Sequence, residues 1–250
     1  MSRHSRASRD SSPFAQPLTY PGEPPSESGI LLDNAYVPAE RATMDELLGE
    51  FCVAPLTHRT PVLAVGSNAS MAQLRRKLHA TGRGRLVVPM TLSHVAGISP
   101  GVSAHVSRPG YVPATPILTP AHHSKLFLVW LDPDQLCVMD ATEPNYVRIP
   151  LPTTRFPVTD ASDGGRILTC DIYVSKHGCL LRPDGTERRL QPQPGLITSL
   201  LGESAALRAL AGDSLESWLQ TMRRPEARDQ ARKIWIREGR VHPPVLYDRP

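Results

Sequence analysis

The sequence has few cysteines and no long apolar run, and each scarcity excludes a class of protein. Its four cysteines show no CxxC spacing, so we expect free thiols rather than disulfides or zinc ligands. No apolar run approaches the ~20 residues that cross a bilayer. The first residues also lack the apolar stretch of a secretory signal. We therefore expect a cytoplasmic protein without membrane contacts and with no bound metal.

Aromatic residues and net charge are also low. Only 13 of the 250 residues are aromatic and the net charge is +4, with the basic residues scattered. A nucleic-acid partner is therefore not expected, because stacking rings and a basic face are the usual signs of one. Proline, in contrast, is abundant at 26 residues, about twice its usual share of roughly 5%. So much proline indicates either disorder or a chain divided into many short elements.

The composition divides the chain into four predicted segments. Residues 1–29 are rich in Ser, Pro and Arg, which predicts a disordered tail. Residues 30–60 read as a linker with a short helix at about 43–51, where Thr43 and Glu46 have capping-box spacing. Residues 61–180 form the predicted main domain. Residues 181–250 carry apolar residues at helical spacing, which predicts a helical C-terminal extension.

The main domain contains many short candidate strands separated by turn residues. The candidates are Pro61–Val65, Arg85–Val95, Ser103–Ser107, Val112–Leu118, Leu126–Leu131, Val147–Val158 and Arg166–Val174. Helices are expected after Ser70 and from Asp132 to Thr142, where Asp132 can cap the helix and Pro133 suits its first position. Strands of this spacing favour a closed sheet. We therefore predict an α+β fold, a small mixed β-barrel with flanking helices.

The first candidate binding element is the turn between the strand that ends at Val65 and the following helix. Gly66, Ser67 and Asn68 form a glycine-containing strand-to-helix turn. Such a turn can direct backbone N–H groups at one point, where the helix dipole adds partial positive charge. A carboxylate or an oxyanion could bind there. The same sequence is also common in turns that are purely structural.

The second candidate is Glu143, at the end of the predicted helix. Leu136, Met139 and Glu143 lie at positions i, i+3 and i+7, which places the carboxylate on the apolar face of the helix. The helix C-terminus also disfavours negative charge. A carboxylate in such a place suits a general acid or base. The alternative is that the frayed helix end turns Glu143 toward solvent.

Together these motifs resemble the gamma-glutamylcyclotransferase family. That family has an apolar strand ending in Tyr-Gly-Ser-Asn-Leu, and Val62–Ala69 takes that place here. It later has a strand with a tryptophan and a short helix carrying Asp-x-x-Glu followed by Tyr. Here Trp130 lies in the strand, and Asp140, Glu143 and Tyr146 have the spacing of the helix motif. The resemblance covers roughly residues 61–174.

The resemblance implies a fold, a reaction and a set of site residues. The fold is a small mixed barrel with a cavity at one mouth, and no metal or cofactor takes part. The reaction cyclises a γ-glutamyl amide or amine to 5-oxoproline and releases the amine, with Glu143 as the acid/base. Val65, Gly66, Ser67, Asn68 and Tyr146 would bind the γ-glutamyl substrate.

One departure from the family pattern leaves a second function open. The family's tyrosine before glycine is Val65 here, which removes a pocket hydroxyl. The chain could therefore be a non-catalytic module that binds a ligand or partner on the same fold. A third reading, binding of nucleic acid, rests on basic runs such as Arg75-Arg76-Lys77, which look like exposed helix faces. The sequence leaves the oligomeric state open, with a homo-oligomer as one option.

Overall fold

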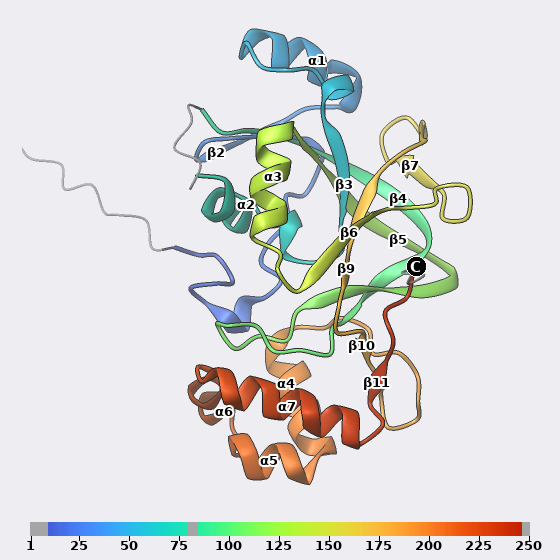
Figure 1. Ribbon diagram of the computed structural model, residues 1–250. Helices are drawn as coiled ribbons and strands as arrows, with labels where there is room; N and C mark the ends of the chain where they lie inside the picture. The colour runs from blue at the N-terminus through green and yellow to red at the C-terminus, as the bar shows by residue number, and fades with distance from the viewer. Residues whose placement is uncertain (1–9, 80–84, 247–250) are drawn as a thin grey trace, which may run out of the picture.

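The computed structural model describes residues 10–79 and 85–246, which form an α+β fold around one mixed sheet (Figure 1). Nine strands make up this sheet. They are β1 (Gly29–Leu32), β2 (Ala35–Pro38), β3 (Thr60–Ala64), β4 (Val87–Val102), β5 (Ala114–Leu131), β6 (Tyr146–Pro150), β7 (Val158–Asp160), β8 (Arg166–Ile167) and β9 (Asp171–Ser175). The main path is β2-β1-β4-β5-β3-β9-β6, with β7 and β8 attached to β4. β3 and β9 pair in parallel, which makes the sheet mixed.

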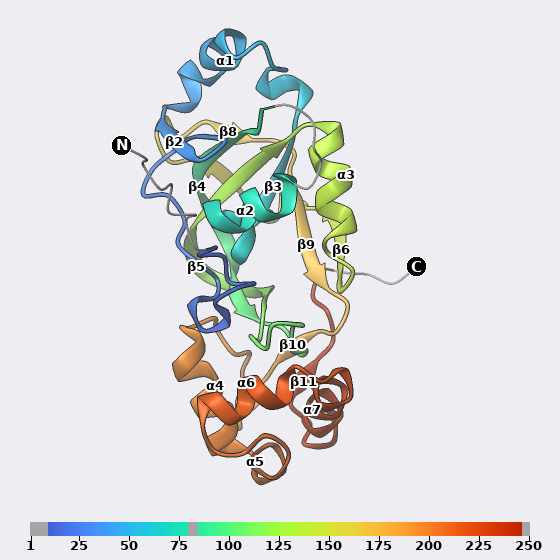
Figure 2. The ribbon, with the colours of Figure 1, turned by 90° about the vertical axis from the view of Figure 1, so that its left-hand side faces the viewer.

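Seven helices of the described ranges lie around the sheet. They are α1 (Arg41–Glu50), α2 (Met71–Leu78), α3 (Pro133–Ala141), α4 (Gln193–Glu203), α5 (Ala205–Ala211), α6 (Leu215–Met222) and α7 (Pro225–Arg237). α2 and α3 cover one face, α1 lies at one end, and α4 to α7 gather at the other end (Figure 2). Near them β10 (Cys179–Leu180) pairs with β11 (Val241–His242). None of the helices in the described ranges is both long and apolar enough to cross a membrane.

Several helix boundaries follow from the sequence signals. The Asp132 side chain accepts a hydrogen bond from the Gln135 N–H and, as predicted, caps α3. The C-terminal helices fall within a few residues of the predicted ranges. The predicted capping box at Thr43 does not form, because α1 begins earlier, with Glu40 as its N-cap residue. The weak amphipathic signal there was enough to predict a helix but not its first residue.

The predicted short strands differ from the structure in their lengths. Most of Val112–Leu118 and all of Leu126–Leu131 belong to one long strand, β5, of 18 residues, which pairs with the 16-residue β4. The register shifts at Ala96/Gly97 of β4, where Gly97 has φ +78° and residues 120–122 of β5 have no partner on β4. Pro120 lies in this bulge, so its missing N–H does not interrupt the pairing. The prolines of the later region do shorten strands, since β6 ends at Pro150.

The predicted closure of the sheet into a barrel is not found. Within the described ranges, no strand pairing joins β6, at one end of the path, to β2 at the other. The sheet is therefore open and strongly bent rather than closed. The bend comes from the long β4–β5 ribbon, whereas closure would also need long strands at both edges. Here β1, β2 and β6 have four or five residues each.

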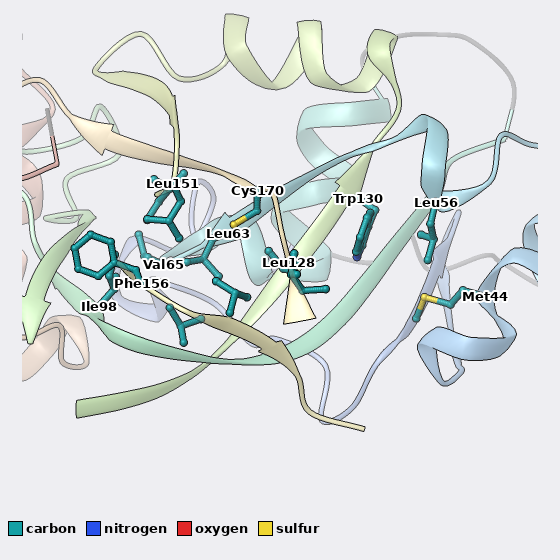
Figure 3. Close-up of a cluster of buried hydrophobic side chains, with 14 of the residues drawn as sticks. Met44, Leu56, Leu63, Val65, Ile98, Leu128, Trp130, Leu151, Phe156 and Cys170 are labelled. Carbon is teal, nitrogen blue, oxygen red and sulfur yellow. The ribbon is translucent and has the colours of Figure 1, made fainter. Parts of the chain in front are cut away.

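Alternate residues of the strands pack on the two faces of the sheet. On β3, Leu63 faces a core that includes Leu128, Trp130, Phe156 and residues of α1 (Figure 3). Val62 and Ala64 face the opposite core, which α2 and α3 cover. The end of β3 therefore enters the layer between the sheet and these two helices, and the candidate turn begins there.

The predicted disordered tail is corrected for residues 10–28. Residues 1–9 lie outside the described residues, but the chain from Asp10 onward packs on the main domain. A short 3-10 helix, η1 (Pro17–Thr19), leads to Tyr20, whose side chain is buried. The segment is poor in apolar residues, so composition alone predicted disorder. Buried side chains such as that of Tyr20 are enough to hold this segment against the main domain.

The C-terminal helices are anchored to the main domain by Trp218 of α6. Its side chain is fully buried, and its Nε1–H donates to the Gly110 carbonyl oxygen at 2.8 Å. We predict that Trp218→Ala lowers the free energy of unfolding by about 3–5 kcal/mol, through a cavity and a lost hydrogen bond. Urea denaturation measures this. The exposed neighbour Glu216 provides the control, since Glu216→Gln should change stability by less than about 0.5 kcal/mol. A loss below about 1 kcal/mol for Trp218→Ala would contradict this anchoring.

Candidate functional site

A cavity of about 420 Å³ lies where the end of β3, the start of α2 and the end of α3 meet. All six residues predicted for the site line it. They are Val65, Gly66, Ser67, Asn68, Glu143 and Tyr146. The sheet brings the two motifs together because β3 pairs with β5 and, through β9, with β6. Two motifs far apart in the chain therefore share one cavity.

Glu143 faces this cavity rather than solvent. It follows the last turn of α3, and its side chain is 15% exposed. Asn68 donates from Nδ2 to Glu143 Oε1 at 3.1 Å. The short 3-10 helix η3 (Ser67–Ala69) places the Asn68 amide there. The structure thus pairs the carboxylate with a side chain of the glycine-containing turn.

Lys77 of α2 completes this cluster. Its Nζ forms an ion pair with Glu143 and also donates to Asn68 Oδ1 at 2.8 Å. The Lys77 side chain is only 4% exposed. The Asn68 amide is held on both sides, since its oxygen accepts from Lys77 and its nitrogen donates to Glu143. The three side chains form a connected buried network with a fixed geometry.

The sequence reading of Lys77 is corrected by this position. The run Arg75-Arg76-Lys77 reads as a solvated helix face, yet Lys77 is buried and Arg76 lines the cavity. The signal that could have found Lys77 is its spacing from Leu74 and Leu78, which pack on the sheet. Lys77 follows Leu74 by three residues, and residues at this spacing lie on neighbouring positions of one helix face. Its long apolar stem can be buried while its ammonium group reaches a carboxylate.

Tyrosine hydroxyl groups surround the rest of the cavity. Tyr146 donates to the Ala114 carbonyl oxygen at 2.8 Å. Tyr20 and Tyr111 stack with ring centroids 4.3 Å apart, and both line the cavity. Burial raises the pKa of all three phenols, and that of Tyr111 reaches about 12. The hydroxyls therefore stay protonated near neutral pH and can donate hydrogen bonds.

Valine at position 65 was expected to remove a hydroxyl from the pocket, but Tyr20 brings a phenol hydroxyl to the same cavity. Val65 has an apolar side chain in the core, as the sequence implies. A Cβ built on Gly66 would lie 2.6 Å from Tyr20 Oη, so the phenol oxygen sits directly over the turn. Sequence reasoning missed Tyr20 because it lies in the segment predicted to be disordered. Glycine is required at position 66 by this close approach.

The charged lining of the cavity is mainly basic. Its charged side chains are those of Arg76, Lys77, Arg108 and Glu143. Arg76 also lies over the Phe14 ring, with its guanidinium carbon 4.3 Å from the centroid. The excess of positive charge suits a ligand that carries a carboxylate or another anion.

His105 lines the cavity, and its buried ring makes the folded protein less stable in acid. Its ring is buried beside His177, and burial lowers its pKa from 6.5 to about 3. Between these values the unfolded chain binds a proton that the folded chain does not. The stabilising effect is therefore complete above pH 6.5 and is lost as the pH falls toward 3.

This linkage gives a testable pH dependence. We predict that His105→Asn flattens the fall in unfolding free energy between about pH 6 and pH 4, by up to about 1.4 kcal/mol per pH unit. Urea titrations of both proteins across this range measure the slopes. His94 is exposed, so His94→Asn serves as the control and should keep the wild-type slope. Equal slopes for His105→Asn and wild type would contradict the prediction.

Comparisons with known proteins give matches at the level of structure alone. No protein-family model matches the sequence, and no curated protein matches it either. A solved structure described as a gamma-glutamyl cyclotransferase matches with 16% identity and a TM-score of 0.39, over 70% of this chain and 99% of that one. An Arabidopsis thaliana protein matches with 13% identity and a TM-score of 0.36, over 52% of this chain and 76% of that one.

A human protein described as uncharacterized gives a similar match. It has 19% identity and a TM-score of 0.36, over 47% of this chain and 67% of the human chain. The chain is thus structurally similar, at low sequence identity, to a gamma-glutamyl cyclotransferase and to these two proteins.

Proposed function

We propose that the protein is a gamma-glutamylcyclotransferase-like enzyme that cyclises a γ-glutamyl amide or amine to 5-oxoproline. The observation that carries the proposal is the contact between Glu143 and Asn68 inside one cavity. It joins a carboxylate able to move a proton to a turn able to hold a substrate. Two motifs that are separately common structural elements thus form one site.

In the proposed reaction, the free α-amine of the γ-glutamyl group attacks its own γ-carbonyl carbon. Glu143 accepts the proton that the α-ammonium must lose, which makes the nitrogen nucleophilic. A carbon–nitrogen bond closes the five-membered ring, and the bond from the γ-carbonyl carbon to the leaving nitrogen breaks. Glu143 passes its proton to that leaving nitrogen, and the ring nitrogen then gives up its second proton to the released amine. The products are a neutral lactam and an ammonium, and the carboxylate is regenerated. Holding the amine and carbonyl in contact supplies much of the rate enhancement.

The basic lining supports a substrate of this class. A γ-glutamyl group carries an α-carboxylate, and Arg76 and Arg108 offer guanidinium groups at the cavity. Planar guanidinium groups bind carboxylates through two parallel hydrogen bonds. The ion pair with Lys77 holds the carboxylate of Glu143 in place at the cavity.

The test is release of 5-oxoproline from a panel of γ-glutamyl compounds. The panel contains γ-glutamyl amino acids, γ-glutamyl amines and α-glutamyl isomers as controls. We expect turnover of at least one γ-glutamyl compound and none of the α-glutamyl isomers. In these isomers the amine is bonded to the α-carbonyl, so closing the ring at the γ-carboxyl group cannot release it or give free 5-oxoproline. No 5-oxoproline from any γ-glutamyl compound would contradict the proposal.

A second candidate is a module that binds a ligand without turnover. It is favoured by the same ion pair, because Lys77 already occupies the carboxylate that would take the substrate proton. The two candidates differ in one outcome. A binding module would give saturable binding of a γ-glutamyl compound, followed by its full recovery unchanged.

A further inference from the structure

Tyr20 reaches the cavity from outside the main domain. It follows η1 in the N-terminal segment, and its side chain is 4% exposed. Its ring stacks on Tyr111 with an interplanar angle of 17°. Phe14 of the same segment also lines the cavity and packs on Arg76. The N-terminal segment is therefore a wall of the candidate site.

The Tyr20 hydroxyl accepts a hydrogen bond from the backbone and keeps its own proton to donate. The Ala114 N–H donates to Tyr20 Oη at 2.7 Å. A phenol oxygen that accepts an N–H group can still donate one hydrogen bond. Among the contacts of the described residues, none gives this O–H an acceptor. The remaining direction is the cavity, where a ligand atom can accept.

The surroundings make this O–H a strong and permanent donor. Burial raises the pKa of Tyr20 well above its usual value, so the phenol does not ionise near neutral pH. The Ala114 N–H behind the oxygen polarises the O–H bond, which strengthens the hydrogen bond that the hydroxyl donates. Glu143 and Tyr20 line the same cavity. The donor and the proposed base therefore face one reaction space.

We propose that the Tyr20 hydroxyl donates a hydrogen bond to the γ-carbonyl oxygen of the substrate and stabilises the negative charge that develops there. This inference rests on the proposed function. As the α-amine attacks, the carbonyl π electrons move to oxygen, and they return when the leaving amine departs. Tyr20 keeps its proton throughout, so the proton balance between Glu143 and the amine is unchanged. A fixed donor at such an oxygen contributes more in the transition state than in the ground state.

The variant Tyr20→Phe tests the proposal, because phenylalanine keeps the stack on Tyr111 and removes only the hydroxyl. We expect kcat for 5-oxoproline release to fall about 10²- to 10³-fold, the usual effect of losing one oxyanion donor. KM should rise by about fivefold at most, the effect of one hydrogen bond lost in the ground state. Assays are run below the unfolding temperature of each protein, because the variant also leaves the Ala114 N–H without its acceptor. An unchanged kcat, or a rise in KM alone, would overturn the proposal.

The control is Tyr36→Phe. Tyr36 donates to the Glu27 carbonyl oxygen at 2.8 Å and does not line the cavity. The Tyr36→Phe variant loses a phenol hydrogen bond outside the cavity, so its kcat should stay at the wild-type value. A fall in kcat equal to that of Tyr20→Phe would show a general effect of lost hydrogen bonds and would overturn the assignment.

A binding measurement separates this inference from the proposed reaction. The lactam oxygen of 5-oxoproline is the former γ-carbonyl oxygen, so Tyr20 should donate to the product as well. We expect Tyr20→Phe to weaken 5-oxoproline binding about fivefold in calorimetry. Turnover with no effect of Tyr20→Phe would overturn only the inference. Weakened binding in a protein without turnover would overturn only the proposed reaction, and neither binding nor turnover by wild type would overturn both.

Discussion

Glu143→Gln is expected to abolish 5-oxoproline release, with a loss of kcat of about 10³-fold or more. The amide keeps the size of the carboxylate and can still accept from Asn68, so the cavity should retain its shape. It cannot take the proton that the α-ammonium must lose. General acid–base catalysis contributes about 10²- to 10⁴-fold, and here one group acts on both the entering and the leaving nitrogen. Liquid chromatography with mass detection of 5-oxoproline measures the loss.

Glu216→Gln is the matched control, because it makes the same chemical change at an exposed position of α6. Its kcat should equal that of wild type. The Glu143→Gln protein must also be shown to be folded, since Lys77 loses its ionised partner. Far-ultraviolet circular dichroism and a urea titration provide this check. A folded Glu143→Gln protein with more than about a tenth of the wild-type kcat would exclude Glu143 as the acid/base.

Lys77→Met is expected to have the largest effect on stability within the site. Methionine replaces the apolar stem of lysine, but it leaves Glu143 charged, mostly buried and without its cation. Removing one partner of a buried ion pair costs about 3–5 kcal/mol, and the partial exposure of Glu143 places the expected loss near about 3 kcal/mol at pH 7. Lys233→Met on α7 is the exposed control, with an expected change below about 0.5 kcal/mol.

The double variant Lys77→Met/Glu143→Gln separates the ion pair from packing. It removes both charges, so it should be more stable than Lys77→Met alone. If the double variant is as unstable as the single one, the loss arises from packing and the ion pair contributes little.

Lys77 should also affect activity through the position and charge of Glu143. In Lys77→Met the Asn68 amide loses the donor to its oxygen, and the carboxylate loses its fixed orientation. We expect kcat to fall about 10- to 100-fold, because a base that is out of position transfers a proton less efficiently. Lys77→Arg keeps a cation at this position and should restore kcat in part. An unchanged kcat in a folded Lys77→Met protein would show that Lys77 does not position Glu143.

The sequence predicted the main partners of the site because short-range geometry determines them. Helical spacing predicted Glu143 on the side of Met139, and although α3 ends at Ala141, both side chains contact Lys77. The glycine-containing turn placed Asn68 just before α2. The pairing of strands β3 and β9 then brought them together. The resemblance of the two motifs supplied the reason to connect them. Their contact is the part of the site that sequence reasoning identified.

Other features depended on tertiary contacts that the local sequence does not encode. Lys77 lies in a basic run, and only the packing of α2 shows that its ammonium is buried. Tyr20 lies in a segment of disordered composition, and its hydroxyl is fixed by backbone groups far along the chain. The length of β5 depends on a bulge at residues 120–122, opposite Ala96 and Gly97 of β4. The prediction of a closed barrel was wrong because, in the described residues, the strands at the two ends of the sheet, β2 and β6, do not pair.

The most direct test of the account is the stoichiometry of products from one γ-glutamyl compound. Wild-type protein is incubated with the best substrate of the panel, and 5-oxoproline and the released amine are quantified together over time. We expect wild-type protein to form equal amounts of 5-oxoproline and the amine, and Glu143→Gln protein to form neither. Amine released together with glutamate would indicate hydrolysis by water instead of cyclisation. That result, or equal 5-oxoproline formation by both proteins, would contradict the account.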